Sequence, residues 1–149
     1  MISALFAFFH FVAVFGIFAA VVLQWQTISP TPTLAEAKRI QTSDRWFGIL
    51  AAVVLIVGFL RVYQFEKGKA FYASNPFFRA KLAIFLIVGL LSIYPTIRYL
   101  KWRAQTKQGL APVLAANEYK AIVALLRVEV VLLLATAGCA SLMARGVGS

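Results

Sequence analysis

The chain's single histidine, His10, lies inside an apolar segment, and two cations border other apolar segments. Neutral imidazole is a common ligand of metals and of haem iron, so His10 is a candidate axial ligand. Arg61 and Lys81 would then donate hydrogen bonds to carboxylates at the edge of a tetrapyrrole. The alternative is structural. In it, His10 bonds to a hydroxyl or backbone carbonyl, and both cations extend towards the membrane surface.

An acidic residue, Glu129, lies within the last apolar segment, two positions after Arg127. A charged side chain in hydrocarbon costs roughly 3 kcal/mol, so we expect Glu129 to be protonated or paired. Arg127 cannot pair with it on one helix, because two residues span about 200° of the helix circumference. Two roles stay open: a proton-relay or substrate-binding acid, or a structural hydrogen bond to Tyr94, Ser92 or the backbone.

Four apolar segments must position these residues. They cover about residues 2–23, 46–63, 80–97 and 121–143. A helix crosses the hydrocarbon core with about 20 residues, and each segment reaches that length with its flanks. The sequence therefore predicts an all-α fold: an integral membrane four-helix bundle. Residues 1–149 form one transmembrane domain, with both termini on the same side.

Prolines and polar residues mark the ends of these segments. Residues 29–33 hold two prolines and end the first helix, and residues 34–42 are expected to form a short separate interfacial helix. Gly68 and Asn75 mark the connection between the second and third spans. Pro95 is expected to kink the last turn of the third span.

The composition favours a membrane protein over a soluble one. Hydrophobic residues make up 62% of the chain, against about 45–50% in typical soluble domains. The net charge is +10, but its Lys and Arg residues lie in loops and at helix ends, which predicts anionic lipid as a partner and no nucleic acid. Because more Lys and Arg residues lie on the side of the loops at residues 24–45 and 98–120, the positive-inside rule favours a cytoplasmic location for these loops. The lone Cys139 excludes an intrachain disulfide.

One long string carries a family resemblance. Residues 58–96 read GFLRVYQFEKGKAFYASNPFFRAKLAIFLIVGLLSIYPT, with His10 early in the first helix and LMARG near the end of the chain. Together these resemble a group of small bacterial membrane proteins catalogued as domain of unknown function 2214. The resemblance covers nearly the whole chain. It implies a multi-pass protein of the bacterial inner (cytoplasmic) membrane.

A more distant resemblance concerns function. The chain is similar to HemJ-type protoporphyrinogen oxidases, four-helix membrane proteins that bind haem b. Their histidine, lysine and glutamate positions correspond here to His10, to Lys81 in RAKLAIFL and to Glu129 in RVEVVLLL. The resemblance implies haem b held by these three residues, with His10 as the metal ligand. Arg61 joins the candidate cofactor-binding residues through its place at the edge of an apolar segment, not through the resemblance. CopD-like copper-handling membrane proteins are similar more loosely.

Two functions follow as expectations. The first is tetrapyrrole binding with a redox role, either on a porphyrinogen or in electron exchange with a quinone. The second is a non-enzymatic accessory subunit that packs within a larger membrane complex or a homo-oligomer. The small size, the 13 Phe, 5 Tyr and 3 Trp residues, and the lack of a strong catalytic motif favour the second. Whether the chain is an enzyme stays open at this point.

Overall fold

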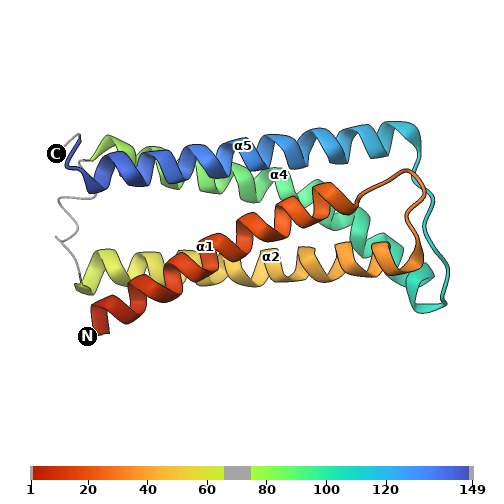
Figure 1. The fold of residues 1–149 in the computed structure, drawn as a ribbon, viewed down its shortest axis with the longest axis horizontal. Coiled ribbons are helices and arrows are strands. Elements are labelled where there is room, and N and C mark those ends of the chain that lie inside the picture. The colour runs from red at the N-terminus through yellow and green to blue at the C-terminus, as the bar shows by residue number, and fades with distance from the viewer. Residues whose placement is uncertain (1, 66–74, 148–149) are drawn as a thin grey trace.

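The computed structural model describes residues 2–65 and 75–147, and all regular structure in that part of the chain is helical (Figure 1). Four long helices account for most of it: α1 (Ile2–Thr27), α2 (Leu34–Leu60), α4 (Pro76–Lys107) and α5 (Ala116–Ala144). One turn of π-helix, η1 (Arg61–Phe65), continues α2. All four long helices are long and apolar enough to cross a membrane, so the chain is a multi-pass membrane protein whose outer surface contacts lipid.

The helices form two antiparallel pairs. α1 packs along α2, and α4 packs along α5. The pairs join through α1 with α5 and α2 with α4, whereas the diagonal helices do not pack together in the described part of the chain. Figure 1 shows both termini at one end of the bundle, which we call side A, and the connections after α1 and α4 at the other, side B. The predicted four-helix bundle with both termini on one side is confirmed.

Helix α2 begins at a capping box. The Glu36 amide donates to Thr33 Oγ1 at 3.2 Å, and the Thr33 amide donates to Glu36 Oε2 at 2.7 Å. The helix then continues unbroken to Leu60, so the separate helix predicted over residues 34–42 is wrong. Nothing interrupts the backbone after residue 42, and Ser43 Oγ donates to the Ala20 carbonyl at 2.9 Å, which holds this turn against α1.

Helix α4 also extends beyond the apolar segment predicted for it. It extends ten residues past the expected end of the third span, to Lys107. Pro95 therefore lies inside the helix and is buried, so its predicted place in the last turn is wrong. The reason is packing: Tyr99 and Trp102, beyond the proline, are buried with their rings 4.9 Å apart.

At each end of the bundle, a hydrogen bond joins segments that are distant in the sequence. On side B, the Leu114 amide donates to the Pro30 carbonyl at 2.9 Å and joins the two connections. On side A, buried Asn75 caps α4, because its Oδ1 accepts from the Phe77 amide at 2.9 Å. Its Nδ2 donates to the Val147 carbonyl at 3.5 Å and so ties α4 to the segment after α5. The connection marked by Gly68 lies outside the described residues.

We expect the two termini to be labelled from the same side of the membrane. Single cysteines would replace Ser3, Val147 or Gln108 in a Cys139→Ala background and be probed with a membrane-impermeant maleimide. Ser3 and Val147 lie at side A and Gln108 follows α4 at side B, so the first two should react from one face and the third from the other. Labelling of Ser3 and Val147 from opposite faces would contradict the fold.

Candidate functional site

His10 packs against a glycine of the neighbouring helix. A Cβ atom on Gly58 of α2 would lie 3.3 Å from His10 Cε1 and 3.7 Å from Nδ1, so the imidazole occupies the space that a side chain would need. Arg61 follows Gly58 by one turn, and its guanidinium carbon lies 5.9 Å from the ring centroid of Phe11. Both His10 and Arg61 are half-buried. The structure thus brings these two predicted residues together where α1 meets α2 and η1, on side A.

Lys81 and Glu129 belong to two other helices. Lys81 is in the second turn of α4, where its Nζ lies 5.1 Å from the ring centroid of Phe78. In the described part of the chain α4 does not pack against α1, the helix of His10. Glu129 is on α5 and near Asp44 of α2, whose position is fourteen residues from Gly58, or about 21 Å at 1.5 Å per residue.

The Glu129 side chain is almost completely enclosed. It is 1% exposed, and its Oε1 has no hydrogen-bond partner among residues 2–65 and 75–147. Its expected structural partners are engaged elsewhere: Ser92 Oγ donates to the Gly89 carbonyl at 2.8 Å, and the Tyr94 ring lies 5.2 Å from the Arg98 guanidinium. As predicted, Arg127 does not pair with Glu129, and its guanidinium carbon lies 5.7 Å from the centroid of the Trp25 ring. Instead, Asp44 and Tyr99 are the electrostatic neighbours of Glu129.

Glu129 belongs to a set of polar side chains that meet between three helices, which we call the polar core. Its members come from α2, α4 and α5: Gln41, Asp44, Thr96, Tyr99, Thr106 and Glu129.

Three hydrogen bonds join α2 to α4 within the polar core. Thr96 Oγ1 donates to Asp44 Oδ1 at 2.7 Å. Gln41 donates through Nε2 to the Tyr99 carbonyl at 2.9 Å, and its Oε1 accepts from Thr106 Oγ1 at 3.2 Å. The Tyr99 hydroxyl, like Glu129 Oε1, is buried without a hydrogen-bond partner among the described residues.

A groove between α2 and α4 leads to the polar core. Its volume is about 420 Å³, and its lining is mostly apolar. Its polar lining residues are Gln41, Asp44, Ser92, Thr96 and Tyr99, and the cations Arg45 and Arg103 also line it. Both arginines are exposed, so they mark its outer part. The groove therefore connects the surroundings of the bundle with the Asp44 carboxyl.

Sequence reasoning found Glu129 but missed the rest of the polar core. A signal was present: Ser92, Thr96, Tyr99, Arg103 and Thr106 recur at spacings of four and three, which places them on one face of a helix. A polar face on an apolar helix indicates that a polar surface lies opposite. The partner residues could not be read in the same way, because which helix supplies them depends on how the bundle packs.

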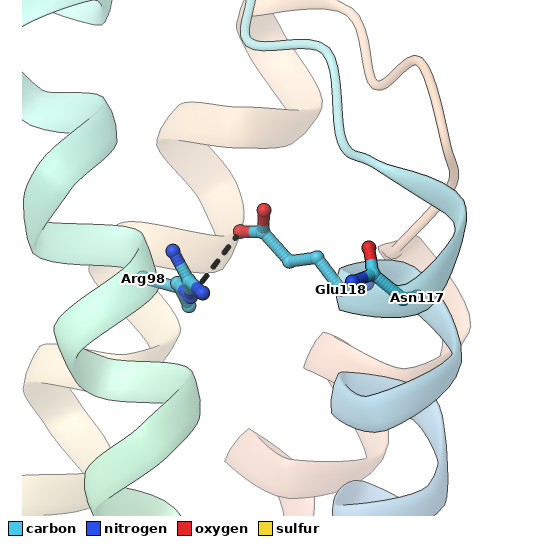
Figure 2. Close-up of polar contacts among 3 residues, drawn as sticks. All are labelled: Arg98, Asn117 and Glu118. Atoms are coloured by element: carbon cyan, nitrogen blue, oxygen red, sulfur yellow. Dashed lines mark hydrogen bonds and ion pairs between the residues drawn. The ribbon is translucent and has the colours of Figure 1, made fainter.

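A separate ion pair lies nearer the side-B end. Arg98 Nε of α4 lies 3.8 Å from Glu118 Oε1 in the first turn of α5, and the Glu118 amide donates to Asn117 Oδ1 at 2.9 Å (Figure 2). The two charged side chains are 34% and 18% exposed, so the pair is worth at most about 1 kcal/mol. Glu118 is thus an acid with a cation partner, in contrast to Glu129.

A family described as "Predicted membrane protein (DUF2214)" matches residues 2–148. The chain belongs to this family. No curated protein and no solved structure matches the chain. These findings give no support to the resemblance to HemJ-type oxidases or CopD-like proteins, which stays a prediction.

The described residues contain no cluster of side chains that could bind a metal ion without a cofactor. Nowhere in 2–65 and 75–147 do three His, Cys, Asp or Glu side chains come together in a way that could hold a metal ion.

We expect alanine at Gly58 and at Gly48 to have different effects, although both glycines lie in α2. Replacing a helical glycine by alanine stabilises by roughly 0.5–1 kcal/mol where space allows. A Cβ at Gly48 would meet nothing within 4 Å, whereas one at Gly58 would crowd the His10 ring at 3.3 Å. Gly48→Ala should therefore stabilise the protein in detergent and Gly58→Ala should not, as measured by thermal unfolding.

The role of the imidazole can be isolated by a double substitution. In a His10→Ala background, Gly58→Ala should regain the stabilisation seen at Gly48, because the crowding partner is gone. Equal gains at both glycines in the parent protein would show that His10 does not pack as described.

Proposed function

We propose that this chain is a tetrapyrrole-binding protein of the bacterial inner membrane, with haem b as its cofactor and His10 as the axial ligand. The observation that supports it is the pairing of His10 with Arg61 at Gly58. The glycine leaves room for an imidazole on the helix surface, and the guanidinium one turn away is a donor suited to a cofactor carboxylate.

The donor set suits a porphyrin better than a bare metal ion. A tetrapyrrole brings four ring nitrogens of its own, so one imidazole from the protein is sufficient for attachment. Lys81, in the second turn of α4, supplies another cation on side A, where α2 ends and α4 begins. Glu129 is left out of this cofactor site because it lies with Asp44, about 21 Å along α2 from Gly58.

The chain's own part in this function is binding and orientation. His10 would fix the iron from one helix, while Arg61 and Lys81 would hold the acidic edge of the ring near the membrane surface. Haem supplies one-electron chemistry when bound, and the proposed use is oxidation of a porphyrinogen or electron exchange with a quinone. The exposed apolar surface on side-A turns of α1, such as Leu5 and Phe9, gives a lipid-soluble reactant direct access to this region.

An absorbance spectrum tests the proposal. Protein purified from cells with ample haem supply should show a Soret band. His10→Ala should lose most of that band, while Gln26→Ala, an exposed polar position on the same helix, should keep it. Arg61→Gln should release haem more readily than Arg103→Gln, because Arg103 lies in the side-B groove. Absence of the band in the parent, or an unchanged band in His10→Ala, would remove His10 as a ligand.

An exposed stripe on α1 favours a second candidate, an accessory subunit within a larger membrane complex or homo-oligomer. Phe8, Val12 and Phe15 are 59%, 49% and 71% exposed, and their spacing of four and three places them on one face. In membranes, helices associate through close side-chain packing, and a flat aromatic face offers a large contact area.

The subunit candidate predicts a particle larger than one chain. Light scattering in mild detergent should give a mass above the 16.4 kDa of the chain after the detergent contribution is subtracted. Phe8→Ala with Phe15→Ala should reduce that mass. Leu134→Ala, which removes a 56% exposed side chain from α5, should leave it unchanged. A colourless, strictly monomeric parent protein with no co-purifying chain would count against the subunit candidate.

A further inference from the structure

We infer that Asp44 and Glu129 form a proton-binding pair, which holds one proton in the interior of the bundle and exchanges it with side-B water through the groove between α2 and α4. This site is distinct from the His10 region and does not depend on a bound cofactor.

The first support is that two buried polar atoms of different helices have no hydrogen-bond partner. Tyr99 and Glu129 are each 1% exposed, and neither the Tyr99 hydroxyl nor Glu129 Oε1 is hydrogen-bonded to any described residue. Buried polar atoms are almost always hydrogen-bonded, so an ionised Glu129 would lack the donors that a buried carboxylate needs, and burial therefore favours its neutral, proton-bound form. A carboxylate can only accept, whereas a protonated carboxyl can also donate.

The second support is the balance of charge around the pair. α2 contributes Asp44, α4 contributes Tyr99, and α5 contributes Glu129. The only titratable side chain of α1 is His10, which packs against Gly58 instead. No salt bridge joins a cation to Asp44 or Glu129 within the described residues. Two ionised carboxyls would therefore repel each other with no ion pair to either of them, and one proton bound by the pair removes half of that charge.

The donor set favours a proton over a metal ion. The pair offers two carboxyls and a phenol, and the Thr96 hydroxyl already directs its hydrogen at Asp44 Oδ1. Hard cations such as Ca²⁺ take six to eight oxygen ligands, more than the polar core presents here.

The groove also sets the order of proton exchange. Asp44 lines it and is half-buried, while Glu129 lies behind at 1% exposure and is not part of the lining. A proton from water would thus reach Asp44 first and pass to Glu129 next. Since α2 begins on side B and Asp44 lies in the side-B half of that helix, exchange would take place with that side.

Infrared spectroscopy of the whole protein in lipid nanodiscs at neutral pH tests the pair. Exposed carboxyls are ionised at that pH, so the stretching band of a protonated carboxyl reports a buried acid. We expect one protonated carboxyl per chain in the parent protein. Glu129→Gln should abolish the band, and Asp44→Asn should shift or abolish it. Glu118→Gln, which removes the acid paired with Arg98, should leave it unchanged.

Several results would overturn the inference. One is absence of the band in the parent, a measurement that needs no variant to fold. Another is a band that persists in both Glu129→Gln and Asp44→Asn. A third is loss of the parent band on addition of sodium chloride but not of choline chloride, which would assign the site to a metal cation.

A second experiment tests whether the proton exchanges through the groove between α2 and α4. On transfer to deuterated water the band should shift as the proton exchanges. Gly48 lines the groove and has open space around its Cβ position, so Gly48→Leu should fill the groove without disturbing the helix. We expect at least severalfold slower exchange in that variant than in the parent protein. An unchanged rate would show that the proton does not enter through the groove.

Discussion

Polar groups carried into the apolar layer must find their partners inside the bundle, because the bilayer offers neither water nor hydrogen bonds. The backbone meets this requirement by forming helices. The side chains meet it only where helices face each other, and the α2–α4 contact shows how. The Asp44–Thr96 and Gln41–Tyr99 hydrogen bonds join two helices that belong to different hairpins. This contact fixes the rotation of α2 and α4, and with it the positions of the groove and of Glu129.

The same constraint separates the molecule into two regions with different chemistry. On side A, His10 and Arg61 meet at a glycine contact between α1 and α2, surrounded by exposed aromatic and aliphatic side chains. Towards side B, acids, amides and hydroxyls converge between α2, α4 and α5. About 21 Å of helix α2 lies between Gly58 and Asp44. A cofactor bound on side A and a proton held in the polar core would therefore lie in separate halves of one small bundle.

Glycines illustrate how packing assigns different roles to identical residues. Glycine often marks close helix packing in membranes, and the long helices contain Gly16, Gly48, Gly58, Gly89 and Gly138. Only two of these are close contacts: a Cβ would lie 2.5 Å from Leu50 Cδ1 at Gly16 and 3.3 Å from His10 Cε1 at Gly58. At the other three, nothing in the described structure lies within 4 Å. Both close approaches occur between α1 and α2, the pair that carries His10.

The sequence by itself determined the fold class, the number of helices and the common side of the two termini. Long apolar runs allow only helices in a bilayer, and an even number of spans returns the chain to its starting side. It also marked His10, Arg61, Lys81 and Glu129 as unusual, since charged or metal-binding groups are costly in hydrocarbon. The sequence did not show which of these residues lie close together. Only the tertiary structure brought His10 and Arg61 to the same helix contact, kept Lys81 on a helix that does not touch α1, and brought Glu129 within electrostatic reach of Asp44 and Tyr99. The physical reason is that side-chain neighbours across helices depend on the rotation and crossing of each helix, which many weak packing contacts decide together.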